Sequence, residues 1–313
     1  MKLPALALAL LLLSSCGSHK SPTDSTLVND QKSNQNQESI LRKQLLEISD
    51  SAKGTVGISF FCPEDGDTLS IHGHDHLPTQ SVYKLMLSMA VLDQVDHGKL
   101  KLDDKIHFEK TDVVPDTHSP IRDKYPKGIP DLPLSEILSA TVSQSDNIGC
   151  DRLFRLIGGP KVVNDYIHSI GITELNIATT EQEMHGDWNI QYTNWCSPLA
   201  MVQILDWIFK KSNAAPSGAT PVYLRKLMVE TTTGPKRIKG LLPPNTEVAH
   251  KTGSGPTNKG ITSATNDAGI ITLPNGKHLI LAVFVSDSKA SEEVRERVMA
   301  KVAKAVYDFK TLK

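Results

Sequence analysis

The segment DAGIITLPNGKHLILAVFVS, residues 267–286, decides the fold. Two apolar, β-branched runs, Asp267–Leu273 and His278–Ser286, flank the turn-forming residues Pro274-Asn275-Gly276. This combination predicts an antiparallel hairpin. A shorter run just upstream, Ala249–Thr252, predicts a neighbouring strand.

The other end of the chain is predicted to complete the same sheet. Glu38–Ser49 has the apolar stripe of a helix, and two β-rich runs follow, Gly54–Cys62 and Asp67–Gly73. Apolar periodicity in the rest of the chain predicts helices over residues 82–95, 134–142, 147–157, 160–170, 198–210 and about 290–309. Strands from both ends must therefore meet in one sheet, with the helical middle as a second lobe. A cleft between the two lobes is the expected place for a site.

The first residues are expected to lie outside this fold. Residues 3–13 form a short apolar run behind Lys2, too short for a membrane span, which predicts a signal peptide over residues 1–16. The small residues before Cys16 are similar to a bacterial lipobox, so Cys16 is predicted to carry lipid; a plain cleavable signal with an incidental cysteine is the alternative. Residues 17–37 are polar and predict a disordered tether, because they have almost nothing to bury.

Composition excludes several classes of protein. A formal net charge of −1 gives no field that favours nucleic acid, and no later apolar run approaches membrane length. Cys62, Cys150 and Cys196 cannot all pair internally, and their spacing matches neither a disulfide framework nor a metal site. We expect them to be mostly buried, inert thiols.

Three short motifs suggest chemistry. Ser81-Val82-Tyr83-Lys84 begins a predicted helix, where residues three apart share a face, so the ammonium group of Lys84 can reach the Ser81 hydroxyl. Serine is a weak nucleophile until a base takes its proton. Ser145-Asp146-Asn147 lies between two predicted helices, where an ordinary helix cap is the simpler interpretation. Lys251-Thr252-Gly253 ends a predicted strand, where a turn is the simpler interpretation.

Together the three motifs are specific. They occur in this order, with 64 residues between the first two (145 minus 81) and 106 between the last two (251 minus 145). The set S-x-x-K, S-D-N and K-T-G resembles that of class A β-lactamases and penicillin-binding proteins. The resemblance covers nearly everything after residue 38, and the chain is most similar to the branch that contains the extended-spectrum cephalosporinases.

The resemblance implies both a fold and an activity. The fold is α/β (α+β): a five-stranded antiparallel sheet flanked by helices, in a lobe from residues 38–80 and 235–313, plus an all-helical lobe over about 81–234. The activity is hydrolysis of β-lactam antibiotics, including cephalosporins, through a serine acyl-enzyme, which confers resistance. The implied partner is the small β-lactam alone, with no cofactor, no metal and no nucleic acid. The protein is expected to be a monomer, exported to the periplasm or lipid-anchored to the bacterial envelope.

The resemblance also assigns catalytic roles. Ser81 attacks the lactam carbonyl, and backbone N–H groups of Ser81 and Ser254 hold the oxyanion. Lys84, Glu181 acting through water, or both take the serine proton. Ser145 relays a proton to the leaving nitrogen, with Lys251 tuning it.

Substrate binding is assigned in the same way. Asn147 is expected to bind the substrate's side-chain amide, and Lys251, Thr252 and an arginine its carboxylate. The strand after K-T-G, where many class A enzymes carry that arginine, has none here. Arg237 is the expected substitute because its fork suits a carboxylate, and a solvated basic turn is the alternative.

The loop acid separates lactamases from penicillin-binding relatives, because a base must direct water at an otherwise long-lived ester. Glu181 fits this role, and Glu183 is its rival; an acid with only a structural role in the loop is a third possibility. In the family a water-holding residue, usually Asn, stands four positions after the glutamate. His185 stands there in this chain.

Other functions stay open at this point. A D-Ala-D-Ala peptidase or transpeptidase, or a β-lactam sensor that stays acylated, would share the three motifs. His72, His74 and His76, with Asp75, could instead bind zinc if they shared one face of an extended segment. Loss of activity on chelation would favour that metal hypothesis.

Overall fold

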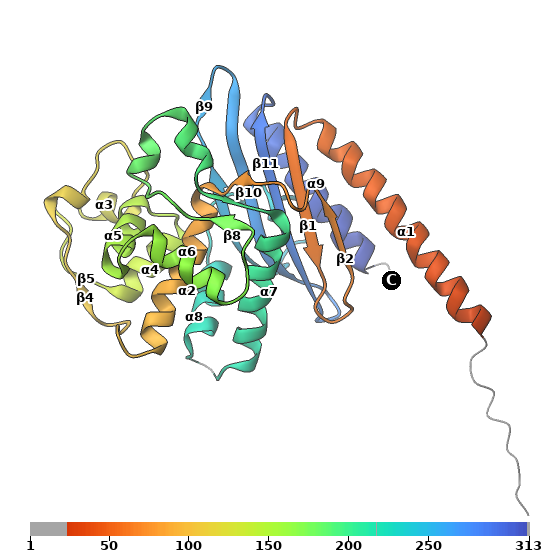
Figure 1. The fold of residues 1–313 in the computed structure, drawn as a ribbon, viewed down its shortest axis with the longest axis horizontal. Helices are drawn as coiled ribbons and strands as arrows, with labels where there is room; N and C mark the ends of the chain where they lie inside the picture. The colour runs from red at the N-terminus through yellow and green to blue at the C-terminus, as the bar shows by residue number, and fades with distance from the viewer. Residues whose placement is uncertain (1–23, 217, 312–313) are drawn as a thin grey trace, which may run out of the picture. The chain divides into compact units, whose positions relative to one another are not determined.

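Residues 24–216 and 218–311 are described by a computed structural model, and residues 41–313 group into one compact unit. The predicted signal peptide and Cys16 lie outside the described residues. Figure 1 follows the chain from α1 to α9.

One antiparallel sheet forms the centre of the compact unit, as predicted. Its five main strands lie in the order β2-β1-β11-β10-β8, and β9 adds a short pairing to β10. Strands from both ends of the chain therefore meet in this sheet. Their bounds are β1 Thr55–Phe61, β2 Thr68–Ile71, β8 Val248–Ser254, β9 Thr257–Asn258, β10 Ile261–Thr272 and β11 His278–Ser288.

The predicted hairpin is confirmed, but β10 is longer than expected. Gly269 pairs with Leu281 across the hairpin, and Gly276 in the turn has a φ of 79°, a conformation that glycine adopts without strain. β10 begins at Ile261, six residues before the apolar run. Its first half is polar and was missed because pairing with β8 and β9, rather than apolar side chains, stabilises it.

The segment between β2 and β8 is mostly helical, as expected. The helices α3 and α8 were not predicted, because the first is a single short turn and the second begins with Thr220-Pro221, shortly after the helix-breaking residues Pro216 and Gly218. The helices are α2 Tyr83–Asp96, α3 Pro120–Lys124, α4 Leu134–Ser143, α5 Asn147–Ile157, α6 Pro160–Ser169, α7 Pro198–Ala214 and α8 Thr220–Val229, with α9 Glu292–Thr311 at the end of the chain. Two-residue strands connect them: β3 Leu77–Pro78, β4 Lys105–Ile106, β5 Leu132–Pro133, β6 Leu175–Asn176 and β7 Trp195–Cys196.

Both faces of the sheet are covered, which explains the nearly continuous apolar sequence of β11. Ile280 and Phe284 belong to the apolar cluster formed with α2, α4, α5 and α7. Leu281 and Val283 point to the opposite face, where they pack with α9 and with Leu45. Figure 1 shows α9 behind the sheet and the helices α2–α8 on its other side.

The prediction of a disordered tether over residues 17–37 is wrong for residues 24–37. The helix α1 covers Asp24–Asp50, so residues 24–37 have helical backbone. Neither glycine nor proline occurs between Asp24 and Asp50, so the helix predicted for Glu38–Ser49 extends toward the N-terminus without interruption.

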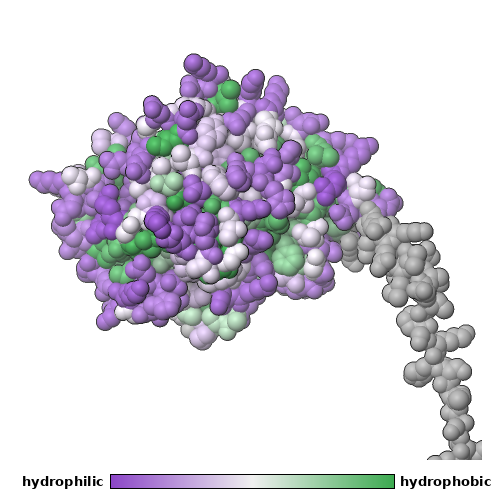
Figure 2. Space-filling model, viewed as in Figure 1, coloured by the Kyte–Doolittle hydropathy of each residue, from purple (hydrophilic) through white to green (hydrophobic). Residues whose placement is uncertain are grey.

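The surface is mainly polar. Figure 2 shows hydrophilic residues over most of the visible face, with small, separate hydrophobic areas. None of the helices within the described residues has the length and apolar content needed to cross a bilayer. The cysteines Cys62, Cys150 and Cys196 are buried and free, as expected, and burial raises the pKa of the Cys62 thiol to about 12.

Candidate active site

Ser81 lies in a tight turn that leads directly into α2. Gln80 precedes it with a φ of 46°, a left-handed conformation that is strained for a residue with a side chain. Two contacts hold this turn in place: the amide of Gln80 donates to Gln191 Oε1 over 3.1 Å, and Asn266 Nδ2 donates to the backbone oxygen of Thr79 over 3.1 Å. The position of the half-buried Ser81 hydroxyl is therefore fixed from outside its own helix.

Lys84, one turn further along, is fully buried and surrounded by oxygen atoms. Its ammonium nitrogen lies 2.8 Å from Ser145 O, 2.5 Å from Asn147 Oδ1 and 3.0 Å from Glu181 Oε1. The expected hydrogen bond from Lys84 to Ser81 is not made in this arrangement, because these three acceptors take the ammonium group. The Ser81 hydroxyl instead donates to Glu181 Oε1 over 3.4 Å.

Ser145-Asp146-Asn147 is a helix cap and a part of the cleft at once. Asp146 caps α5 by accepting from Gly149 N over 2.7 Å, and its other carboxylate oxygen accepts from Ile121 N over 2.7 Å. Ser145 has a φ of 61° and accepts a hydrogen bond of 2.9 Å from Lys251 Nζ. The cap interpretation is right for Asp146, while its two neighbours line the cleft.

Lys251 is enclosed completely. Burial, and after it the charge of Lys84, hold the pKa of Lys251 well below its ordinary value. A lysine of lowered basicity gives up a proton more readily, so Lys251 and Ser145 are suited to share one.

The structure distinguishes the two candidate loop acids. Glu181 is only 7 % exposed and contacts both Ser81 and Lys84. Glu183 is exposed and accepts from Thr180 N over 2.7 Å, so its carboxylate stabilises the loop. Glu181, and not Glu183, therefore lies beside the candidate nucleophile.

The backbone of strand β8 packs directly against the turn that contains Ser81. A Cβ added to Gly253 would lie 2.4 Å from Thr79 O and 3.2 Å from Gln80 Cβ, so only glycine allows this approach. The approach places Ser254 and Ser81 on the wall of one cleft of about 400 Å³, which Ser145, Asn147, Glu181, Thr252 and Arg237 also line.

Known proteins are similar to this chain in sequence and in fold. The model of the β-lactamase enzyme family matches residues 40–309. The chain belongs to the β-lactamase enzyme family. The β-lactamase VEB-1 of Pseudomonas aeruginosa is 42 % identical over 254 residues, 81 % of this chain and 85 % of VEB-1. The extended-spectrum β-lactamase PER-1 of the same species is 43 % identical over 277 residues, 88 % of this chain and 89 % of PER-1.

Solved structures agree with these relatives. The extended-spectrum β-lactamase TLA-1 superposes with a TM-score of 0.84 at 48 % identity, covering 87 % of this chain and 99 % of that one. A β-lactamase from Chitinophaga pinensis gives 0.83 at 51 % identity, covering 86 % and 98 %. The five-stranded fold is confirmed, and the chain is a class A β-lactamase that hydrolyses β-lactams.

Arg237 of this β-lactamase lies in the cleft and makes several contacts there. Its guanidinium group donates to Ser254 Oγ over 2.7 Å and to Gly253 O and Asn266 O, each over 3.0 Å. Glu296 Oε1 lies 3.3 Å from its Nε. The side chain is buried, so it is not the solvated basic turn of the alternative interpretation.

Asn147 and His185 are two more of the predicted site residues. Asn147 Nδ2 donates to Thr117 Oγ1 over 2.8 Å while its oxygen accepts from Lys84, so both ends of its amide already have protein partners. His185 is exposed and lines a small pocket next to Glu181. Its role in holding water stays a prediction.

The clustered histidines do not share one face. β2 ends at Ile71, and His72 has a φ of 51°, so the segment turns instead of continuing as a strand. His72 bonds Asp75 over 2.9 Å, His74 bonds Glu174 over 2.8 Å, and His76 stacks on Trp195. No group of three metal-ligating side chains forms in the described part of the chain. The histidines are thus used separately in hydrogen bonds and stacking.

Sequence reasoning missed two residues that hold the Glu181 loop. Asp151 on α5 accepts from Glu181 N over 2.8 Å and from Gln182 N over 2.9 Å. Burial raises the pKa of the Asp151 carboxyl to about 6. Asn194 accepts from Thr179 N over 2.9 Å on the other side of the loop. Neither belongs to a motif, and no signal in the sequence connects them to the loop.

The Asp151 contacts give a testable consequence. In an Asp151→Asn variant the single amide oxygen can accept from only one of the two loop N–H groups, and the amide NH₂ group opposes the other. We expect the loss of one buried hydrogen bond to loosen Glu181 and to lower kcat by tenfold or more, on the order of 1–3 kcal/mol. Stopped-flow measurements with nitrocefin should show that deacylation slows more than acylation.

The matched control is Asp103→Asn, which makes the same chemical change at an exposed position and should leave both rates unchanged. An equal slowing of acylation and deacylation in Asp151→Asn would contradict an effect through Glu181.

Proposed function

We propose that Ser81 opens the β-lactam ring of penicillins and cephalosporins, that Glu181 releases the resulting ester, and that this activity confers resistance. The observation that carries the proposal is the convergence of Ser81, Lys84 and Glu181, with Glu181 Oε1 3.4 Å from the Ser81 hydroxyl and 3.0 Å from the Lys84 ammonium group. The names of PER-1 and TLA-1 include the term extended-spectrum, which supports a substrate range that includes cephalosporins.

In the proposed acylation the Ser81 oxygen attacks the lactam carbonyl while its proton passes to Glu181, directly or through water, or to Lys84. Backbone N–H groups of Ser81 and Ser254 stabilise the negative charge on the former carbonyl oxygen. The close contact of Gly253 in β8 with the Ser81 turn supports this assignment of the two N–H groups, because it brings together the segments that carry them.

The ring then opens as the C–N bond breaks, and the nitrogen needs a proton. We assign this transfer to the Ser145 hydroxyl, which Lys251 contacts over 2.9 Å. The lowered pKa of Lys251 supports it as the group that restores the Ser145 proton. The proton taken from Ser81 then passes back to Lys251 through Lys84 and water, so that Glu181 is free to act as a base again.

In the proposed deacylation Glu181 takes a proton from water as the water oxygen attacks the ester carbonyl, and Ser81 leaves with a proton. The 3.0 Å contact with Lys84 holds the Glu181 carboxylate aimed at the site. Asn147 binds the amide of the substrate's side chain after exchanging one of its protein partners.

A nitrocefin assay tests the function as a whole. We expect many turnovers per enzyme molecule, because Glu181 supplies the base that deacylation requires. A single equivalent of product, or very slow turnover, would contradict the proposal and favour the peptidase or the sensor.

We propose that Arg237, with Lys251 and Thr252, binds the substrate carboxylate. Loss of a charge-assisted hydrogen bond costs about 1.5–3 kcal/mol, so Arg237→Ala should raise KM for benzylpenicillin about tenfold or more while kcat changes less. The measurement is steady-state kinetics on benzylpenicillin and on its methyl ester, which lacks the charge.

Lys236→Ala, in the same turn but exposed, is the matched control and should behave as the unchanged enzyme. An Arg237→Ala effect of equal size on the ester would mean that Arg237 only supports the fold.

We also propose that the protein is exported as a monomer, without metal or cofactor, to the periplasm or to a lipid anchor on Cys16. Residues 1–16 would be removed as the signal peptide, and residues 17–37 would join the anchor to the catalytic domain, residues 38–313. Within it, residues 38–80 and 235–313 form the α/β lobe and about 81–234 the helical lobe. The lipobox-like residues before Cys16 support the anchor.

A further inference from the structure

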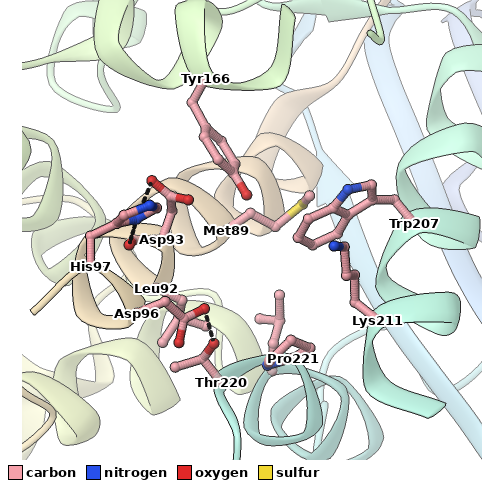
Figure 3. A pocket seen from close by; sticks show the side chains of 11 residues that line it. Met89, Leu92, Asp93, Asp96, His97, Tyr166, Trp207, Lys211, Thr220 and Pro221 are labelled. Carbon is pink, nitrogen blue, oxygen red and sulfur yellow. Dashed lines mark hydrogen bonds and ion pairs between the residues drawn. The ribbon is translucent and has the colours of Figure 1, made fainter. Parts of the chain in front are cut away.

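A second hollow lies at the opposite end of α2 from Ser81. It opens between α2, α6, α7 and α8, has a volume of about 180 Å³, and includes no residue of the catalytic cleft (Figure 3). Its α2 residues begin at Met89, and Asp93 lies twelve positions after Ser81, roughly 18 Å along the helix axis. The hollow is therefore separate from the site described above.

The walls of the hollow suit one aromatic ring. Tyr166 and Trp207 form two aromatic sides, and the thioether of Met89 points between them (Figure 3). Leu92 and Leu224 are buried and add an apolar floor. An apolar cavity of about 150 Å³ is large enough to hold benzene, so this volume admits a ring of that size.

One edge of the hollow carries two carboxylates. Asp96 accepts from Thr220 Oγ1 over 2.6 Å through one oxygen, and His97 Nδ1 lies 3.5 Å from the Asp93 carboxylate. The Tyr166 hydroxyl points into the same space (Figure 3). Within the described residues it has no hydrogen-bond partner, and burial together with the charges of Asp93 and Asp96 raises its pKa.

Two basic side chains line the hollow, His97 and Lys211. His97 is exposed, and Lys211 is an exposed side chain on α7 whose ammonium nitrogen lies 5.5 Å from the Trp207 ring centre. Figure 3 shows Lys211 beside Trp207, across the hollow from Asp93. The carboxylate edge therefore favours a positive charge, and the apolar remainder favours a ring.

We propose that this hollow is a binding site for a small arylalkylammonium ion. The ring lies between Tyr166 and Trp207 over Met89, and the ammonium group contacts Asp93 and Asp96 on the other side of the hollow. The Tyr166 hydroxyl accepts one hydrogen bond from the ammonium group. A carboxylate on the same ring would be repelled by the two aspartates.

Three probes that carry the same phenylethyl group and differ in charge test the proposal: 2-phenylethylammonium, 2-phenylethanol and 3-phenylpropionate. Titration calorimetry and the shift of the Trp207 indole signal in NMR measure binding. For the nine heavy atoms of the ammonium ion we expect a dissociation constant of roughly 1 mM. The alcohol should bind about fivefold more weakly, and the propionate should not saturate.

A double variant, Asp93→Asn with Asp96→Asn, separates the charge from the cavity. Asparagine at 96 keeps an oxygen for Thr220, so the fold should persist, and affinity for the ammonium ion should fall to that of the alcohol. The control Asp50→Asn with Asp103→Asn removes the same charge from two exposed positions and should change nothing.

Nitrocefin kinetics test whether the probe binds in the catalytic cleft or outside it. Binding at the proposed hollow leaves the KM for nitrocefin unchanged at saturating 2-phenylethylammonium. The proposal is overturned by a KM that rises with probe concentration, by equal affinity for all three probes, by affinity that survives the double variant, or by no saturation below about 50 mM.

Discussion

Replacement of Ser81 by alanine is expected to abolish turnover, lowering kcat for nitrocefin by about 10⁴-fold or more. Without the hydroxyl no ester can form. Because the nucleophile and its base act together, removing the nucleophile alone lowers kcat about as much as removing both. A 10⁴-fold loss corresponds to about 5.5 kcal/mol of transition-state stabilisation. The measurement is steady-state nitrocefin hydrolysis at enzyme concentrations high enough to detect residual activity.

Two controls make the Ser81→Ala result specific. Ser51→Ala, at an exposed turn, should retain full activity. Thermal unfolding should show that Ser81→Ala keeps its fold, because its small side chain is replaced by a smaller one at a half-buried position. Turnover above about one hundredth of the original rate in the alanine variant would exclude Ser81 as the nucleophile.

Replacement of Glu181 by glutamine is expected to stop the reaction after its first half. Ser81 can still be acylated, because Lys84 as a neutral amine can donate to Ser145 O and Asn147 Oδ1 and take the serine proton with its remaining lone pair. Deacylation should slow by about 10³-fold, since an amide cannot take a proton from the attacking water. Stopped-flow absorbance should record a burst of one equivalent of nitrocefin product followed by a slow phase.

Glu183→Gln is the matched control, because it makes the same change two residues away. Glu183 is exposed and its carboxylate bonds Thr180, and a glutamine oxygen can still accept from Thr180 N. Its turnover should stay within a few-fold of the unchanged enzyme. Normal turnover in Glu181→Gln with loss of turnover in Glu183→Gln would reverse the assignment.

The sheet and the motifs could be predicted because their signals are local. The hairpin around Pro274-Asn275-Gly276 combines alternating burial with a turn sequence, and both act over a few residues. The S-x-x-K spacing depends only on one helical turn. The start of β10 could not be predicted, because Ile261–Asn266 is mostly polar and is stabilised by its pairing with β8 and β9 rather than by an apolar pattern of its own.

The residues that complete the site are far apart in the sequence. Asp151 lies thirty positions before the loop that it holds, and the bond of Lys84 to Ser145 O spans sixty-one. The sequence predicted a Lys84–Ser81 bond from helical spacing alone. In the folded chain, acceptors from α5 and from the Glu181 loop surround Lys84, and the Ser81 hydroxyl turns to Glu181.

For the histidine cluster, a local sequence pattern predicted an arrangement that does not form. Alternation over His72, His74 and His76 is typical of one face of a strand, but the strand ends before them. A positive φ at His72 and three different partners separate the imidazoles. Alternating residues share one face only where the strand continues to pair with a neighbouring strand.

Mass spectrometry of the Glu181→Gln variant tests the central claim most directly. After mixing with a cephalosporin, the intact protein should gain the mass of one opened β-lactam and retain it for minutes, and digestion should locate this mass on the peptide that contains Ser81. Absence of the adduct during undiminished turnover, or an adduct on any other peptide, would contradict an ester on Ser81 that Glu181 releases.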